Sequence, residues 1–179
     1  MRGNNRSSSN SLPKYLKESE IKNMLERANR NRKRDYLILL TLFRTGMRNS
    51  ELVNLKKKDI SFSEGHITVR KGKSEKDRII PLDTHLKDLL DVYAGEKGKD
   101  ERIFDVTTRT VRNIVKRYSE EEWVHPHTFR HSFAVKCLKD EMNLVSLQKI
   151  LGHSSLETTQ IYLDLIGEDV KKDFEKVEW

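Results

Sequence analysis

The amino-acid sequence predicts a mostly helical domain with one small antiparallel sheet, an α+β fold. Apolar residues recur at intervals of three and four before residue 56 and again after Asp83, and this spacing is typical of amphipathic helices. Between these stretches, three short apolar runs separated by glycine-containing turns predict strands. The length of 179 residues fits one domain, or one domain with a short appendage.

The N-terminal part predicts a leader followed by two helices. Residues 1–11 (MRGNNRSSSNS) are rich in Asn, Ser and Arg and lack apolar periodicity, so we expect a flexible leader there. Ile21, Met24 and Leu25 have helical spacing and predict a helix over Glu18–Asn29. A more apolar stretch, Asp35–Met47, predicts a buried helix.

A third, short helix is expected where the second one stops. The second helix should end near Gly46, because glycine is common just past a helix end. Asn49 or Ser50 would then cap a helix through Leu55. Glu51 would lie in its first turn, where a negative charge suits the helix dipole.

The remaining elements follow from the same two patterns. The predicted strands are Asp59–Phe62, His66–Arg70 and Arg78–Pro81, with turns at Gly65 and Gly72–Ser74. They should form an antiparallel sheet in which a basic loop joins two of the strands. Helical spacing then returns at Leu86–Tyr93, Val111–Tyr118, Phe129–Leu138, Leu144–Leu151 (ended by Gly152), Leu156–Leu163 and Glu168–Val177.

Composition excludes several classes of protein. A single cysteine, Cys137, excludes an internal disulfide framework and fits a reducing compartment. No apolar run approaches the roughly 20 residues that a membrane span needs, and the first residues lack the apolar core of a secretory signal. We therefore expect a soluble, cytoplasmic protein without a membrane partner.

The distribution of charge indicates a polyanionic partner. Residues 1–34 hold ten Lys and Arg against three Asp and Glu, which accounts for the whole net charge of +7. The run Arg70–Arg78 holds five basic and two acidic residues. Nucleic acid is the commonest partner for such a surface, while charge alone supports an ion-rich, merely soluble surface equally well.

Five segments carry side chains that can do chemistry. Each has an ordinary alternative when it is taken alone: a surface ion pair, a solvated hairpin tip or half-buried packing. The segments are TGMRNSEL (45–52), GKSEKDRIIPL (72–82), HPHTFRHSF (125–133), LGHSS (151–155) and TTQIYL (158–163).

The histidine-rich segment is the one that suggests a metal, and its details argue against one. His127 and His131 are four residues apart, a spacing found in zinc sites. The zinc-protease pattern, however, needs Glu where this sequence has Thr128, and the guanidinium of Arg130 is unfavourable beside a cation. If a helix begins near His127, His127 and Arg130 share a face. Three histidines near an arginine therefore favour reading or cleaving a phosphate, and we expect no metal or other cofactor.

In combination, these segments resemble the catalytic domain of the tyrosine recombinase (phage integrase) family, with most similarity to Xer-type recombinases and their archaeal relatives. The resemblance runs from Leu12 and Pro13 (LPKYLKESEI) to about residue 177. It implies the catalytic-domain fold of that family and an enzyme that breaks and rejoins DNA strands without a metal or ATP.

The resemblance assigns roles in the first half of the chain. Arg48, in TGMRNSEL, matches the first family arginine, and Glu51 matches the acidic residue that supports it. Lys73 matches the lysine of the β-hairpin, because GKSEKDRIIPL aligns without a gap on the family pattern GKGxKxRxxPL; Lys71 is the alternative if the hairpin is shifted.

The second half of the chain supplies the rest of the site. His127 and Arg130 match the family's His-x-x-Arg pair, His153 the position held by His or Trp, and Tyr162 the nucleophile. Four further basic side chains are expected to contact DNA: Lys71, Lys76, Arg78 and His131.

The implied reaction begins when the Tyr162 hydroxyl attacks a DNA phosphodiester, which yields a 3′-phosphotyrosyl link and a free 5′-hydroxyl. The 5′-hydroxyl of a second strand then reverses the step. Arg48 and Arg130 would hold the non-bridging oxygens with forked, permanently charged donors. His127 or the phosphate itself would accept the tyrosine proton.

The leaving group and the last phosphate contact complete this implied mechanism. Lys73 would protonate the leaving 5′-oxygen. His153 would donate a hydrogen bond to a phosphate oxygen.

The resemblance also shows one departure and one further segment. Relatives carry an N-terminal core-binding domain of about a hundred residues, whereas only a short leader precedes the match in residues 12–166. We expect either a catalytic fragment or a naturally short member, with weak, salt-sensitive DNA binding.

Residues 167–179 form a predicted helical tail. Val170, Phe174 and Val177 give it an apolar face. It would either pack on a neighbouring protomer, so that the chain self-associates on double-stranded DNA as a dimer or tetramer, or fold back on its own domain.

Three alternative functions remain open at this point. A topoisomerase-like nicking activity would use the same chemistry without a partner. A non-catalytic DNA-binding accessory or regulator would keep the fold only. A metal-dependent hydrolase would use the histidines and would be sensitive to EDTA.

Overall fold

The fold is known from a computed structural model of the chain, which describes residues 12–70 and 77–166. The expected leader (1–11), the hairpin lysines Lys71, Lys73 and Lys76, and the expected tail helix Glu168–Val177 lie outside the described residues. Within the described part of the chain, no helix is long and apolar enough to cross a membrane.

Three helices form the N-terminal part, as the sequence predicts. They are α1 (Glu18–Asn31), α2 (Lys33–Thr45) and α3 (Asn49–Asn54). The α2 helix ends at Gly46, whose φ of 58° lies in the left-handed region that favours glycine. A Cβ at Gly46 would come within 2.4 Å of the Phe133 ring, so the glycine also allows the end of α2 to approach another helix.

The predicted cap of α3 is wrong by one residue. Asn49 is already helical, and Arg48 holds the extended N-cap position. The Arg48 backbone N–H donates to Oε2 of Glu51 at 2.6 Å. Glu51, three residues after the cap, therefore satisfies the backbone amide of the N-cap residue itself, as in a capping box.

The predicted sheet is confirmed. A short 3₁₀ turn, η1 (Lys57–Asp59), leads into β1 (Ile60–Ser61), β2 (His66–Val69) and β3 (Arg78–Pro81). The three strands are antiparallel in the order β1-β2-β3, and Val69 pairs with Arg78 where the basic loop begins and ends.

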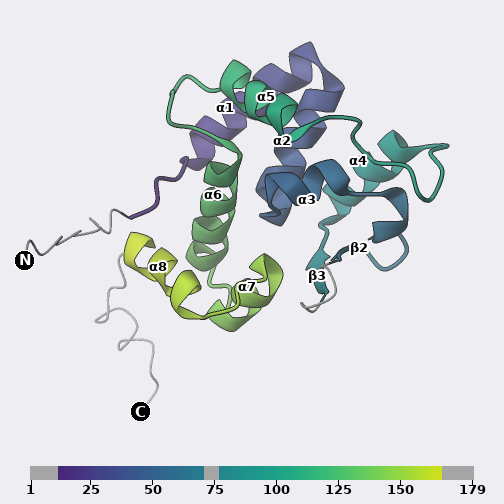
Figure 1. Ribbon diagram of the computed structural model, residues 1–179. Helices are drawn as coiled ribbons and strands as arrows, with labels where there is room; N and C mark the ends of the chain where they lie inside the picture. The colour runs from purple at the N-terminus through teal and green to yellow at the C-terminus, as the bar shows by residue number, and fades with distance from the viewer. Residues whose placement is uncertain (1–11, 71–76, 167–179) are drawn as a thin grey trace, which may run out of the picture.

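In residues 77–166, five helices follow the sheet: α4 (Thr84–Ala94), α5 (Thr108–Tyr118), α6 (Pro126–Lys139), α7 (Leu144–Leu151) and α8 (Glu157–Ile166). The α6 helix runs through the middle of the molecule, with α1, α2 and α5 at one end and α7 and α8 at the other (Figure 1). It starts at Pro126, a residue well suited to a first turn because its fixed φ is helical.

The buried apolar residues fall into two clusters. The larger one, which we call the main core, joins α1 to α5, the sheet and Phe129 at the start of α6. The smaller one, the C-terminal cluster, joins the rest of α6 to α7 and α8. Its seven buried members are Ala134, Val135, Cys137, Leu138, Leu147, Leu151 and Tyr162.

Candidate active site

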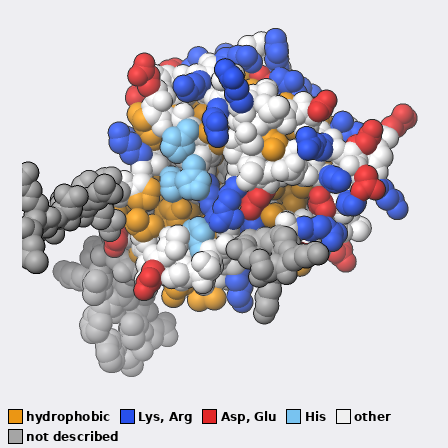
Figure 2. Space-filling view, in the orientation of Figure 1, with side chains coloured by type: hydrophobic (Ala, Val, Ile, Leu, Met, Phe, Trp, Pro, Cys, Tyr) orange, Lys and Arg blue, Asp and Glu red, His pale blue; other side chains and the backbone are white. Residues whose placement is uncertain are grey.

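Most of the predicted site residues come together on one face of the molecule. Figure 2 shows histidine side chains in a row beside a patch of Lys and Arg on this face. The contributing segments are the start of α3, the first turns of α6, the α7–α8 turn and α8 itself. The residues that meet there are Arg48, Glu51, His127, Arg130, His131, His153 and Tyr162.

Glu51 is bound by two arginines. Arg48 Nη1 donates to Glu51 Oε1 at 3.1 Å, and Arg78 donates through both terminal nitrogens, at 2.8 and 2.7 Å. Burial raises the pKa of the Glu51 carboxyl, but the hydrogen bonds and charges of the two arginines outweigh it, so the pKa lies below its usual value. The Arg48 side chain stays 39% exposed, which leaves donors facing the open side of the site.

Arg78 lies in a different place from the one expected. As a DNA-contacting residue it should be exposed, but its side chain is only 6% exposed. Besides Glu51, it binds the Ile150 carbonyl through Nε at 2.8 Å. The reason is the close packing of β3 against the end of α7, where a Cβ at Gly152 would lie 2.6 Å from Arg78 Cδ. Arg78 thus links elements inside the protein.

Arg130 is buried at the centre of the site. It is 1% exposed, and its terminal nitrogens donate to the carbonyls of Gly46 and Leu151 at 2.8 and 2.7 Å. Burial first, and then the charge of Arg48, lower the pKa of Arg130 to about 10, so the guanidinium stays charged at neutral pH. Its planar guanidinium has five N–H donors, more than these two carbonyls occupy.

The rings of two α6 histidines are in contact along one side of the site. His127 is exposed at the start of the helix, and its ring meets that of His131 edge to face, with centroids 4.6 Å apart. Partial burial of the ring and the nearby charge of Arg130 lower the pKa of His127. Burial first, and then the neighbouring His127, lower the pKa of His131 to about 4, so His131 is neutral at pH 7.

Tyr162 contacts His131 rather than His127. The Tyr162 hydroxyl and Nδ1 of His131 are 3.0 Å apart and share a hydrogen bond. Tyr162 is 2% exposed, and burial raises its pKa, which the charge of Arg130 partly offsets. His131, expected to contact DNA, therefore has an internal partner on α8.

His153 lies between the arginines and the tyrosine. It follows Gly152, the left-handed residue that ends α7 as predicted. Its ring stacks on Tyr162 with centroids 6.4 Å apart and planes 15° apart. Its Nδ1 shares a hydrogen bond of 2.9 Å with the hydroxyl of Thr159, a residue that the sequence analysis did not single out. Thr159 lies three positions before Tyr162, and this helical spacing was the signal in the sequence that could have placed both side chains on one face of the helix.

The arrangement suits an anion better than a cation. Among the described residues, no three His, Cys, Asp or Glu side chains form a group that could hold a metal ion. Burial first, and then the positive charges of Arg130 and Arg48, lower the pKa of His153 to about 4. Such a site can bind a phosphate through arginine and neutral imidazole donors.

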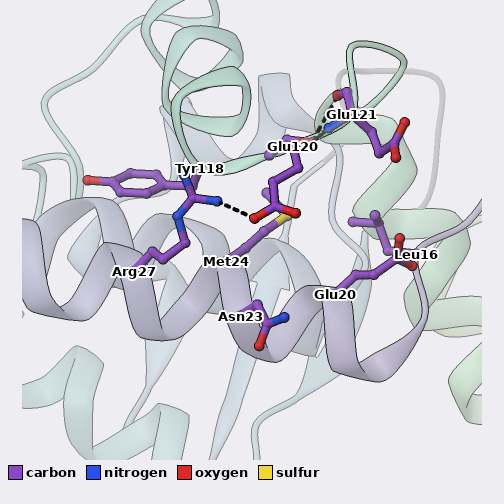
Figure 3. Close-up of a pocket in the computed structure, with 9 residues that line it drawn as sticks. Leu16, Glu20, Asn23, Met24, Arg27, Tyr118, Glu120 and Glu121 are labelled. Carbon is purple, nitrogen blue, oxygen red and sulfur yellow. Dashed lines mark hydrogen bonds and ion pairs between the residues drawn. The ribbon is translucent and has the colours of Figure 1, made fainter.

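One hollow borders the site, and another lies away from it. One, of about 300 Å³, lies between α3 and β2 and extends from Glu51 to Arg70, where the chain enters the basic loop. The other lies between α1 and the end of α5, and an ion pair between Arg27 and Glu120 crosses it (Figure 3). None of the predicted site residues lines this second pocket, and its three glutamates do not suit a phosphate.

Comparison with known proteins places these segments in one family match. The model of the phage integrase family matches residues 14–167. The tyrosine recombinase XerA of Thermococcus kodakarensis is 39% identical over 178 residues, which cover 93% of this chain and 63% of XerA. XerA of Pyrococcus furiosus is 38% identical over 177 residues, which cover 92% of this chain and 62% of that protein. The chain thus spans less than two thirds of the length of these relatives.

Solved structures agree in fold. The crystal structure of XerA recombinase superposes with a TM-score of 0.76 at 31% identity, over 94% of this chain and 67% of that one. The catalytic domain of bacteriophage HP1 integrase has a TM-score of 0.73 at 28% identity, over 90% of this chain and 94% of that domain. The mainly helical fold with its three-stranded sheet is therefore a tyrosine recombinase catalytic-domain fold, and the chain belongs to the phage integrase family of tyrosine recombinases.

Proposed function

We propose that the chain is the catalytic domain of a site-specific tyrosine recombinase, which cuts and rejoins DNA strands through a 3′-phosphotyrosyl intermediate. One observation carries this proposal: side chains from separate segments meet in one place. Besides burial, the charges of Arg130 and Arg48 lower the pKa of His153, and the charge of Arg130 partly offsets the rise that burial causes in the pKa of Tyr162. The rings of His153 and Tyr162 stack on each other. Two arginines beside a tyrosine combine an anion site with a nucleophile.

Double-stranded DNA is the proposed substrate. A structural neighbour at 28% identity and a TM-score of 0.76, XerH site-specific recombinase, was solved bound to its difH substrate. In this chain, the net charge of +7 and the guanidinium groups beside the histidine row are suited to a phosphodiester.

The chemistry that we propose is nucleophilic substitution at phosphorus. The Tyr162 oxygen forms a bond to the phosphorus, the bond from phosphorus to the 5′-oxygen breaks, and the strand is left with a 3′-phosphotyrosyl end. Arg48 and Arg130 neutralise the charge that develops on the non-bridging oxygens. Because the covalent intermediate keeps the energy of the broken bond, the reverse step with another 5′-hydroxyl needs no ATP.

We assign the tyrosine proton to His131. The sequence favoured His127 or the phosphate as acceptor, but the hydrogen bond of 3.0 Å joins Tyr162 to His131. Burial is the main cause of the low pKa of His131, and neighbouring positive charges add to it; an anionic phosphate would offset those charges. His127, more exposed, stays available as a donor to the phosphate.

The remaining roles are proposed on the sequence resemblance. Lys73 protonates the leaving 5′-oxygen, with Lys71 as the alternative, and Lys76 contacts the DNA backbone. All three are outside the described residues. The match to XerA over nearly the whole of this chain supports assigning these roles to the basic loop.

Assembly and location also belong to the proposal. In this proposal, residues 167–179 pack on a neighbouring protomer and join copies of the chain on DNA. The protein acts in the cytoplasm. Sedimentation of the protein on DNA, with and without residues 167–179, tests this: loss of dimers or tetramers on truncation is expected, and an unchanged mass contradicts it.

The test of the activity uses a nicked suicide duplex, in which loss of a short 5′ fragment traps the covalent intermediate. We expect a covalent protein–DNA adduct on a denaturing gel, formed in EDTA and absent for Tyr162→Phe. A duplex library of random sequence removes the need to know the target site. Binding of the library without any adduct would contradict strand cleavage and favour a DNA-binding accessory role.

A further inference from the structure

A buried threonine contacts the histidine of the proposed phosphate site. Thr159 is fully buried at the third position of α8, although Thr158 and Gln160 on either side are exposed. Its hydroxyl lies 2.9 Å from Nδ1 of His153. Neither the expected roles nor the family comparison gives Thr159 a function.

The rest of His153 is held as well. Its backbone N–H donates to the Gln148 carbonyl at 3.2 Å, and the Gln148 side-chain amide donates back to the His153 carbonyl at 3.3 Å. The backbone of His153 is therefore fixed from α7 and its ring is fixed from α8. One property of the ring is left to its hydrogen bond with Thr159: which of the two ring nitrogens carries the proton.

The hydrogen-bond pattern of Thr159 favours one tautomer. Burial first, and then the charges of Arg130 and Arg48, lower the pKa of His153 to about 4, so at neutral pH the ring is neutral and has one donor and one acceptor nitrogen. Within residues 12–70 and 77–166, Nδ1 of His153 is the partner of the Thr159 hydroxyl. If Nδ1 carried the proton, the buried hydroxyl hydrogen would lose its acceptor, which is costly.

We propose that Thr159 is a positioning residue that donates to Nδ1 of His153 and thereby keeps the proton on Nε2. The ring then presents an N–H donor toward a phosphate oxygen held by Arg48 and Arg130. In the opposite tautomer Nε2 would carry a lone pair, which repels that oxygen. The tautomer of a histidine is commonly set in this way by the partner of its other nitrogen. This inference rests on the proposed function.

The first experiment measures the tautomer directly and needs no DNA. Long-range ¹H–¹⁵N correlation spectra of the full chain report which ring nitrogen of each histidine is protonated, and the signals of His153 are identified by their loss in His153→Gln. We expect the Nε2–H form in the wild type and in Thr159→Ser, which keeps the hydroxyl. Thr159→Val, which has the same shape without the hydroxyl, should give a mixture of both forms.

The second experiment measures the consequence for cleavage. At saturating suicide duplex, Thr159→Val should slow adduct formation about 10-fold or more with unchanged DNA affinity, while Thr159→Ser should approach the wild-type rate. In a His153→Ala background, Thr159→Val should cause no further loss, because its effect passes through His153. Thr158→Val, the same change at the exposed neighbour, is the matched control and should change neither spectrum nor rate.

The outcomes separate this inference from the proposed function. An Nδ1–H form in the wild type, or a Thr159→Val spectrum identical to it, overturns the positioning role. Additive losses in the double variant also overturn it, because they would indicate a structural effect of Thr159 alone. A wild-type chain that shows the expected tautomer but forms no adduct overturns strand cleavage and leaves the tautomer assignment supported.

Discussion

The main core and the C-terminal cluster differ greatly in the apolar surface that stabilises them. Among the residues that the structure describes, the main core contains twenty-nine buried apolar residues, from Leu16 to Phe129, and the C-terminal cluster contains seven. Since burial of apolar side chains is the dominant stabilising term, the C-terminal cluster is expected to open more readily than the main core.

The proposed catalytic groups are divided between these two regions. Arg48, Glu51, His127 and Arg130 lie on α3 and the first turns of α6, beside the main core. His153 and Tyr162 lie on the α7–α8 turn and α8, and Tyr162 is itself a member of the C-terminal cluster. The two arginines of the proposed anion site thus lie beside the main core, whereas His153 and the proposed nucleophile belong to the region that is expected to open more readily.

Two arginines make the polar connection between the regions. Arg78 donates to the carbonyl of Ile150 and Arg130 to that of Leu151, at the C-terminal end of α7. Carbonyls at a helix end lack intrahelical partners, and the dipole makes this end attractive to cations. The comparison teaches that Arg130, a group proposed to bind phosphate, also helps to hold the region of the proposed nucleophile in place.

The largest effect should come from Arg130, because it serves both regions. Arg130→Lys keeps the charge but loses the fork that binds two carbonyls and an anion, so we expect adduct formation to fall by about 10²–10³-fold. Single-turnover cleavage of the suicide duplex measures this. The control is Lys136→Arg, which also exchanges one cation for another, at a more exposed position of the same helix. If both variants had equally small effects on adduct formation, the proposed role of Arg130 would be contradicted.

The next effect concerns the link through Arg78. Arg78→Met leaves Glu51 without its forked partner in a buried position, so the free energy of unfolding should fall by about 3–5 kcal/mol. Urea denaturation measures the loss. Arg27→Met removes a more exposed ion pair with Glu120 and should cost at most about 1 kcal/mol. If both changes cost the same, Arg78 does not link the regions.

The two clusters can be compared with matched truncations. Leu39 and Leu147 are both fully buried, one in the main core and one in the C-terminal cluster. Each change to Ala should cost about 2–5 kcal/mol locally. In hydrogen exchange, Leu147→Ala should speed exchange in α7 and α8 alone, whereas Leu39→Ala should speed it everywhere. Uniform acceleration by Leu147→Ala would show that the molecule opens as one unit.

The smallest predicted effect is on pH dependence. The pKa of His131 in the folded chain is about 4, below the value of about 6.5 for an unfolded chain. Between these values the unfolded chain binds more protons, so the free energy of unfolding falls as the pH drops through this window. His131→Asn should reduce this fall by about 1–2 kcal/mol in denaturation curves between pH 7 and pH 4.5.

The control for this prediction is His85→Asn. His85 is an exposed histidine of α4, and the same substitution there shows how far the loss of a histidine side chain alone changes the measured curves. If His131→Asn leaves the pH dependence unchanged, burial does not keep His131 neutral.

The sequence predicts those features that depend on neighbours along the chain. Helical and alternating spacing identified the helices and the sheet, and Gly46 and Gly152 marked two helix ends correctly, because a left-handed residue is a local requirement. The site residues were grouped by resemblance, and the structure brings Arg48, Arg130, His153 and Tyr162 together.

Other features depend on how distant elements pack, and the sequence did not reveal them. An arginine beside a basic loop is ordinarily exposed, so the burial of Arg78 follows only once β3 is known to meet the end of α7. The pairing of His131 with Tyr162 needs the position of α8 on α6. The role of Thr159 likewise requires knowing which of two adjacent threonines faces inward.

Gly152 affects how mutational data on this protein should be interpreted. A side chain there would be strained by the left-handed backbone and would collide with Arg78. In a library that replaces every residue, this position should therefore score as intolerant as Tyr162, the proposed nucleophile, although it has no functional group. Intolerance and chemistry are separate properties here, and only an assay that scores abundance beside activity would tell the glycine from the tyrosine.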